Sequence, residues 1–312
     1  SIRRQRQMCI RDSLPYWYPP LWGIVLGGIG LIVDPVLDPT LYLFITRSIL
    51  MAGDVAVGLI LLRASRGSLL HFGFWMLNPL VIGVAQSGQF DVLAVLFSLL
   101  AYTSHKERRG PLTGVLIGLG FSFKFWPILF LPLFLADYRE NGSGYAKNLV
   151  FATLATSIAV SFPFALTTEY LTSVIDMVGY VRILLAILSL FLLHYVSRKL
   201  GSSLLSISCF TVTLLLIVLP NHIQYALWLM PFLLLYMVEH PSKMLAVLAN
   251  VLWIAHFLQR YNVAILKVSG LDVTFPTAAF DVIYLAILAY VVWRLCDRRL
   301  VLGCDTSSPV KL

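Results

Sequence analysis

The chain has 312 residues, of which 59% are hydrophobic and only 12% are charged, and its mean hydropathy is +0.86. An average soluble domain carries about 25% charged residues, so the composition excludes an ordinary soluble protein and predicts a polytopic membrane protein. The formal net charge of +8 would favour nucleic acid as the partner of a soluble chain. Here it indicates Lys and Arg in cytoplasmic loops, so we expect membrane lipid as a partner and no nucleic acid. The four cysteines show no metal-ligand spacing.

The first 13 residues contain no apolar run, so they predict neither a signal peptide nor a membrane span. Residues 8–13 read MCIRDS, which resembles one reading frame of a sequencing adaptor. The sequence therefore favours a non-native segment at 1–13, with a basic cytoplasmic leader as the alternative. The rest is predicted to be one transmembrane domain, residues 14–300, followed by a cytoplasmic tail, residues 301–312.

The next stretch is typical of a membrane–water interface. Residues 14–20 read LPYWYPP, and their tyrosines belong either to an aromatic belt or to a site. The apolar run 21–33 is too short to cross, which predicts an interfacial or re-entrant helix. Residues 41–62 follow as a full span. Arg47 and Asp54 lie two turns apart on one helical face, so we expect a buried structural pair.

Residues 69–91 combine an apolar run with a break and a polar end. Asn78-Pro79 interrupts the run and predicts a kink, with the Asn side chain bonding the freed backbone. A short polar tip follows, which carries Gln86, Gln89 and Asp91. Charge bias places this tip on the outer side and the basic residues of 105–109 in the cytoplasm. A polar tip with a carboxylate at membrane level is a candidate functional site.

The segment 112–135 allows two interpretations. It is long enough to cross once, but Lys124 is central and two prolines follow, so it can also form two short helices that meet at Lys124. The hairpin keeps the later basic clusters on the cytoplasmic side, and we therefore expect the hairpin. The predicted fold class is all-α, a transmembrane helix bundle with about 10 to 11 membrane segments. The remaining spans are expected at 90–102, 147–166, 181–196, 204–219, 223–238, 244–258 and 278–293.

Lys124 is the strongest single candidate for binding. A lysine in the middle of a membrane segment costs about 2.5 to 3.5 kcal/mol by insertion scales, and no acidic residue lies one turn away in the sequence. An anionic ligand such as a phosphate would offset that cost, while snorkelling of the long side chain is the alternative. The sequence contains neither a glycine-rich phosphate loop nor a metal cluster.

Taken together, several motifs resemble the GT-C glycosyltransferases that span the membrane many times. The motifs are FWMLNP, the tip QFD, Lys124 with its two following prolines, the Arg47/Asp54 spacing and IQYALWLMP at 223–231. The resemblance is to polyprenyl-phosphate-mannose-dependent mannosyltransferases, including the catalytic subunits that act on GPI precursors. It implies inverting transfer of a hexose, mannose in these enzymes, to a lipid-linked or glycan acceptor on the non-cytoplasmic face. It allows a small membrane subunit as a partner and implies no cofactor beyond the lipid-linked donor.

The resemblance also suggests roles for individual residues. Lys124 and His222 would hold the donor phosphate, the tip residues would bond sugar or acceptor hydroxyls, and Tyr18 would shape the pocket. The predicted substrate-binding set is Tyr18, Gln86, Gln89, Asp91, Lys124, His222, Gln224 and Tyr225; the structural set is Arg47, Asp54, Asn78 and Pro79. His222 and Gln224 sit at a span boundary, where a polar interfacial role is the alternative.

In the family, the catalytic base is an aspartate in the first outer loop, and no counterpart precedes Tyr18 outside residues 1–13. We therefore expect a chain that lacks the first span and the base and is inactive by itself. The expected location is a prokaryotic plasma membrane or the endoplasmic reticulum. The rival function is a transporter or flippase for an anionic lipid or a small anion, with Lys124 as its binding charge.

Overall fold

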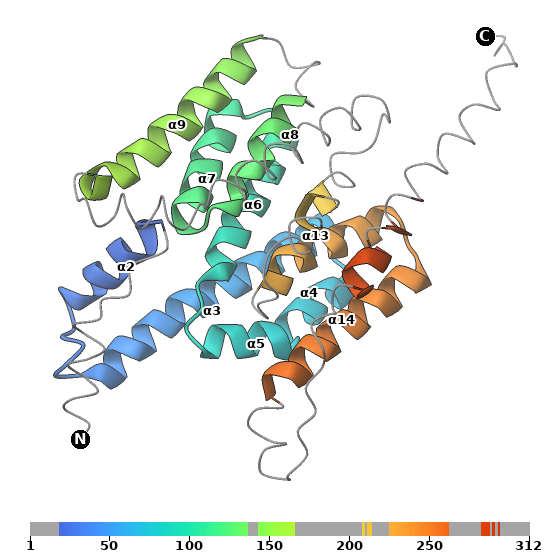
Figure 1. The fold of residues 1–312 in the computed structure, drawn as a ribbon, viewed down its shortest axis with the longest axis horizontal. Helices are drawn as coiled ribbons and strands as arrows, with labels where there is room; N and C mark the ends of the chain where they lie inside the picture. Colours follow the sequence, from blue (N-terminus) through green and yellow to red (C-terminus); the bar gives the residue numbers. More distant parts are fainter. Residues whose placement is uncertain are drawn as a thin grey trace, which may run out of the picture.

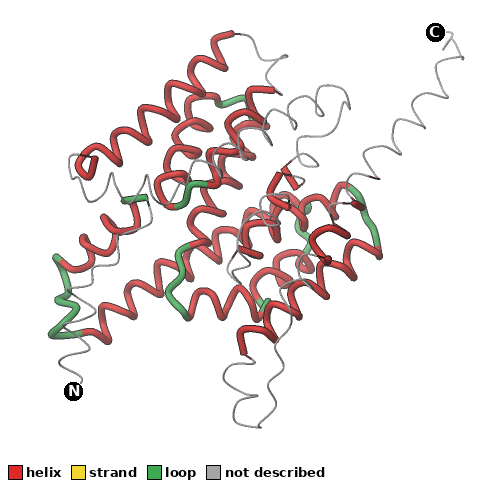
Figure 2. Tube along the Cα trace, in the orientation of Figure 1, coloured by secondary structure: helices red, strands yellow, loops and turns green. Residues whose placement is uncertain are grey.

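The computed structural model describes residues 19–136, 143–165, 208–209, 211–213, 225–261, 282–287, 289–290 and 293. In these residues every regular element is a helix, as the sequence predicts (Figures 1 and 2). The predicted span at 181–196 lies outside the described residues, and those at 204–219 and 278–293 are described only in part. The helices are α2 (Leu21–Gly30), α3 (Pro39–Ala64), α4 (Leu69–Met76), α5 (Pro79–Gln86), α6 (Asp91–Lys106), α7 (Gly110–Phe123), the 3-10 helix η1 (Trp126–Leu129), α8 (Phe130–Ala136), α9 (Ser143–Ala165), α13 (Ala226–Glu239) and α14 (Lys243–Tyr261).

Two of the described helices are long and apolar enough to cross a bilayer alone, namely α3 and the stretch Gly144–Phe164 of α9. The pair α4 and α5 passes the same test together, with a bend of 42° between its two arms. Other apolar helices of the described part, such as α7 and α13, have 10 to 17 residues. The all-α membrane fold is therefore confirmed, whereas the expected 10 to 11 membrane segments are not reached within the described residues.

Helix α3 begins where Asp38 caps it, with the carboxylate accepting a hydrogen bond of 3.0 Å from the Leu41 N–H. Asp54 lies in the buried stripe of this helix, but Arg47 is exposed, and no ion pair joins the two in the described part of the chain. The prediction that Arg47 and Asp54 form a buried pair is therefore wrong. Seven residues of helix separate the two by about 10.5 Å, and the long Arg47 stem carries its charge outward.

The kink between α4 and α5 has the predicted cause. Pro79 has no N–H for the Trp75 carbonyl, and the Asn78 N–H donates to that carbonyl instead, at 3.2 Å. The Asn78 side-chain oxygen then accepts from the Leu80 N–H at 2.9 Å and caps α5. Because the bend leaves these backbone groups paired, it is tolerable at membrane depth.

The hairpin prediction for residues 112–135 is confirmed in its outline. α7 ends at Phe123, Lys124 adopts an extended conformation (φ −146°, ψ 149°), and η1 and α8 follow. Figure 1 shows α8 returning beside α7. Lys124 therefore lies at the junction of the two arms rather than inside a continuous helix.

Two glycines allow α7 and α9 to pack closely side by side (Figure 1). A Cβ atom added to Gly114 would clash with the Leu149 carbonyl oxygen and would lie 2.7 Å from the Ala152 Cβ. At Gly118, one turn later, it would lie 2.7 Å from the Thr156 Cβ. Small residues at this spacing are typical of helix pairs that meet backbone to backbone in membranes.

We expect Gly114→Ala to separate α7 from α9 and to lower stability by about 1 to 3 kcal/mol, the usual cost of overpacking. Gly27→Ala in α2 is the matched control, since a Cβ there meets nothing within 4 Å. The measurement is the thermal aggregation temperature of the purified protein in detergent. Equal aggregation temperatures for the two variants would contradict the close contact.

Candidate functional site

The polar tip ends in a buried ion pair. Asp91 is the first residue of α6 and is fully buried, and its Oδ1 lies 3.5 Å from the Nζ of Lys124, which is 4% exposed. The same Oδ1 accepts a hydrogen bond of 2.8 Å from the indole N–H of Trp228 in α13. The cluster thus joins the start of α6, the α7–η1 junction and α13. The N-terminus of α6 adds a favourable partial charge for the carboxylate.

Aromatic rings enclose this pair on several sides. The Lys124 ammonium lies 4.6 Å from the centroid of the Phe90 ring, and the ring of Trp22 in α2 stacks on Phe90 with a centroid separation of 5.1 Å. The Trp228 ring stacks on Trp126 of η1 at 5.2 Å. Rings at these distances favour a cation over their faces and exclude water. The ion pair therefore lies in a low-dielectric environment where each charge depends on the other.

The Asp91–Lys124 pair corrects the prediction that an anionic ligand offsets the cost of burying Lys124. The sequence shows no acid one turn away, but the fold brings in Asp91 from 33 positions earlier in the chain. Asp91 offsets the cost of burying the ammonium group, so an anionic ligand is not needed to explain that burial. In the described residues, Asp91 Oδ2 has no hydrogen-bond partner. The carboxylate thus keeps unused accepting capacity beside the pair.

The predicted tip divides into an accessible and a buried part. Gln86 is exposed and Gln89 is half-buried, whereas Asp91 is buried beneath them. The turn is fixed by the Ser87 hydroxyl, which donates to the Val84 carbonyl at 2.7 Å, and by Gly88, whose φ of +74° suits glycine. Gln86 and Gln89 are therefore available to a ligand, while Asp91 holds Lys124.

The other predicted substrate-binding residues, which lie around Tyr18 and just before α13, are described only in part. Tyr18, His222 and Gln224 lie outside the described residues, so their predicted roles stay predictions. Tyr225 comes immediately before α13, and its ring centroid lies 4.2 Å from that of Trp228. The sequence analysis did not single out Trp126 or Trp228. Both could have been found from the sequence, because Trp126 lies two residues after Lys124 and Trp228 lies in the same motif as Tyr225.

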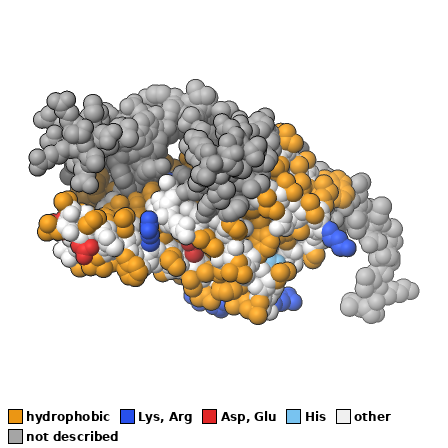
Figure 3. Space-filling view, turned by 90° about the horizontal axis from the view of Figure 1, so that it is seen from below, with side chains coloured by type: hydrophobic (Ala, Val, Ile, Leu, Met, Phe, Trp, Pro, Cys, Tyr) orange, Lys and Arg blue, Asp and Glu red, His pale blue; other side chains and the backbone are white. Residues whose placement is uncertain are grey.

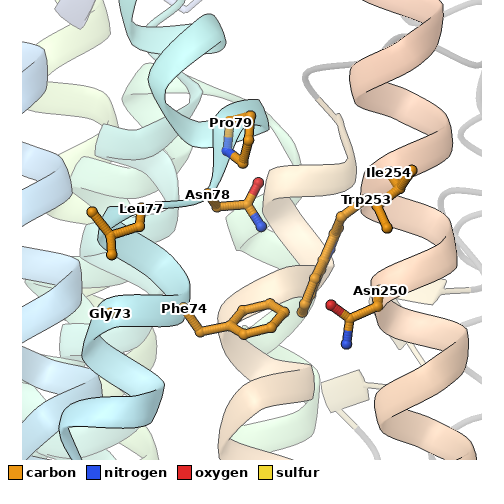
Figure 4. A pocket seen from close by; sticks show the side chains of 8 residues that line it. All are labelled: Gly73, Phe74, Leu77, Asn78, Pro79, Asn250, Trp253 and Ile254. Carbon is orange, nitrogen blue, oxygen red and sulfur yellow. The ribbon is translucent and has the colours of Figure 1, made fainter.

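A separate pocket lies at the kink, between the α4–α5 bend and α14 (Figure 4). Its volume is about 260 Å³. Figure 4 shows the Asn78 amide directed across the space toward α14. Phe74 faces Trp253, and their ring centroids are 4.5 Å apart. The lining residues are Gly73, Phe74, Leu77, Asn78, Pro79, Asn250, Trp253 and Ile254.

The surface is suited to lipid. Hydrophobic side chains cover most of the described surface in Figure 3, with only scattered charged groups. Exposed large side chains such as Phe44, Phe151 and Phe162 would be costly in water and favourable in a bilayer. Among the described residues, no three His, Cys, Asp or Glu side chains gather in a metal-binding arrangement. The fold and site together define an integral membrane protein with a polar cluster at the end of a broken span.

Comparison with known proteins identifies the class more closely. The chain belongs to glycosyltransferase family 87, whose sequence profile matches residues 16–264. That stretch includes the polar tip, the Asp91–Lys124 pair and the kink. Family membership confirms the resemblance to the membrane mannosyltransferases and favours an enzyme over the transporter alternative.

Fungal proteins named GPI mannosyltransferase 1 are similar to parts of the chain. The Candida albicans protein is 30% identical over 138 residues, which are 37% of this chain and 35% of that protein. The Eremothecium gossypii protein is 28% identical over 113 residues, which are 35% of this chain and 28% of that protein. The matched stretch thus spans about a third of the curated relatives' length. No solved structure matches the chain significantly.

We expect single neutral substitutions in the ion pair to be more harmful than the double substitution. Asp91→Asn or Lys124→Met leaves one buried charge without its partner, which costs about 3 to 5 kcal/mol, whereas removing both charges is close to neutral. In the double variant, Trp228 can still donate to the amide oxygen that the Asp91→Asn change introduces. The measurement is the thermal aggregation temperature in detergent. A double variant as unstable as the worse single variant would contradict a direct pairing.

Proposed function

We propose that the protein transfers a hexose, mannose in the simplest case, from a polyprenyl-phosphate carrier to a lipid-linked or glycan acceptor, with inversion at the anomeric carbon. Family membership over residues 16–264 supports a glycosyl transfer, and the names of the fungal relatives support mannose as the sugar. The observation that carries the proposal is the polar tip that leads into Asp91, whose buried carboxylate pairs with Lys124. The tip thus combines accessible amides with a carboxylate that fixes a buried ammonium group, at one end of a broken membrane span.

In the proposed reaction, the acceptor hydroxyl oxygen attacks the anomeric carbon as the bond from that carbon to the phosphate oxygen breaks. The phosphate leaves with the bonding electrons, and a general base takes the hydroxyl proton. Phosphate is a fair leaving group, so positioning and neutralisation of its charge supply most of the catalysis. The base is not assigned to a residue of this chain.

Lys124 is proposed to neutralise the donor phosphate. An ammonium group has three donor positions and can contact a carboxylate and a phosphate oxygen together. Asp91, fixed by Trp228, would hold the ammonium in place before the donor arrives. Gln86 and Gln89 would bond hydroxyls of the sugar or acceptor, and His222, Gln224, Tyr225 and Tyr18 would complete the donor side.

The proposed enzyme crosses the membrane several times and works on the non-cytoplasmic face of a plasma membrane or of the endoplasmic reticulum. α6 has 16 residues, about 24 Å, and separates the polar tip from the basic residues after its end. That length approaches the roughly 30 Å hydrocarbon core of a bilayer, so we propose that α6 crosses it and that its two ends lie on opposite sides. A small membrane subunit remains compatible with this arrangement.

We predict that cysteines at Ser87 and Glu107 face opposite sides of the membrane. Both positions are exposed, Ser87 in the turn before α6 and Glu107 directly after it, so both react with a thiol reagent once it can reach them. In sealed spheroplasts or in oriented microsomes, a membrane-impermeant maleimide should label one position before permeabilisation and the other only afterwards. Labelling of both from the same side would contradict the topology.

We predict that, in an enzyme that also carries the general base, Lys124→Ala lowers sugar transfer by about 10² to 10³-fold, the typical effect of removing a group that stabilises developing charge. Lys124→Arg should restore only part of it, because the planar guanidinium differs in shape from the ammonium. The assay follows labelled mannose from polyprenyl-phosphate mannose into lipid-soluble product in membranes that contain equal amounts of each protein.

The double variant Asp91→Asn/Lys124→Met provides the control for folding. It removes the same cation without leaving an unpaired buried carboxylate, so it should be folded and inactive. Transfer at the wild-type rate by this variant would exclude Lys124 from the reaction.

A further inference from the structure

The pocket at the kink is lined by neutral side chains. Its two walls come from the α4–α5 bend and from α14, and none of the eight lining residues is charged. Two of its three polar side chains are already bonded to backbone: Asn78 Oδ1 caps α5, and Asn250 Nδ2 donates to the Ala246 carbonyl at 2.7 Å. Apart from the amide ends of Asn78 and Asn250, the lining is hydrocarbon and aromatic. A charged headgroup therefore finds no counter-charge here, whereas an apolar chain finds matching contacts.

The rim of the pocket is exposed and apolar. Leu77 is 78% exposed and Ile254 is 56% exposed at its rim, whereas Trp253 at its base is 3% exposed. A chain in the bilayer can therefore enter from the side without crossing a polar region.

The pocket lies on the same helix as the polar tip. α5 begins at Pro79, which lines the pocket, and ends at Gln86, the first polar residue of the tip. Its eight residues span about 12 Å. Helix α14, which forms the other wall of the pocket, also contacts α5. A lipid whose phosphate is at the tip would therefore bring the first few units of its tail to the pocket.

We propose that this pocket binds the isoprenoid tail of the sugar donor, close to its phosphate end. The proposal rests on the proposed function, since it takes the donor to be a polyprenyl-phosphate sugar. The tail packs between Leu77 and Ile254 at the rim and against Phe74 and Trp253 inside. Its contact with the pocket fixes the depth of the lipid in the bilayer and so delivers the phosphate to the level of the tip.

The test uses a long-chain polyprenyl phosphate that carries a photoreactive diazirine in its third isoprene unit. Irradiation in proteoliposomes, followed by peptide mapping, should place the crosslinks on α4, on the start of α5 and on α14. An excess of unmodified polyprenyl phosphate should abolish them, whereas an excess of a diacyl phospholipid should not. Crosslinks centred on other helices, or equal competition by the phospholipid, would overturn the proposal.

Matched variants test the pocket itself. Ile254→Trp fills the rim and should reduce specific crosslinking about 10-fold, the effect of losing roughly 55 Å² of apolar contact. Val247→Trp lies two turns earlier on the same face of α14, is 60% exposed and is outside the lining, so it should label like the wild type. Equal labelling of both variants and the wild type would contradict tail binding in the pocket.

The sugar-transfer assay separates this inference from the proposed function. In an enzyme that also carries the general base, specific crosslinks in the pocket without any sugar transfer would retain the tail site and refute the reaction. Transfer with crosslinks elsewhere would retain the reaction and refute the tail site.

Discussion

A charge buried in a membrane protein must have a partner, and this requirement shapes the centre of the molecule. Lys124 and Asp91 are both almost fully buried and lie 3.5 Å apart. Each belongs to a different part of the chain, and Trp228 adds a third part through its hydrogen bond to Asp91. Because either charge alone is costly, the α6 start, the α7–η1 junction and α13 have to meet. The polar tip that precedes Asp91 takes its position from this contact.

Breaks in the helices are the second constraint, and they occur where a site is needed. Asn78 and Pro79 break a span and leave a pocket, while Lys124 ends α7 and leaves an extended residue. In both places the backbone groups near the break are bonded by a side chain or by a neighbouring N–H. The chain can therefore expose polar groups at membrane depth without leaving its backbone unpaired. The tip and the pocket lie at opposite ends of α5 as a result.

Local features were predictable from the sequence because their causes are local. The kink follows from a proline and an asparagine side by side, and the junction at Lys124 follows from one central charge and two prolines. The all-α class follows from composition and from the length of the apolar runs. Family motifs around Asp91, Lys124 and Tyr225 were also sufficient to indicate the class of enzyme before any comparison.

Long-range pairing could not be read from the sequence in the same way. Seven-residue spacing suggested that Arg47 pairs with Asp54, but Arg47 is exposed, and its long stem lets the charge leave the bundle. The absence of an acid near Lys124 in the sequence predicts an external anion as its partner, yet the fold supplies Asp91. Trp228 is 137 positions from Asp91, and only the packing of α13 against α6 brings them together.

The position of the donor phosphate tests the central claim most directly. It can be measured by electron cryomicroscopy of the protein in a lipid nanodisc with a bound polyprenyl phosphate. The account predicts phosphate density within about 3 Å of Lys124 Nζ, below Gln86 and Gln89, with Asp91 still bonded to Trp228. Phosphate density at another site, with the Asp91–Lys124 pair closed and no ligand at the tip, would contradict it.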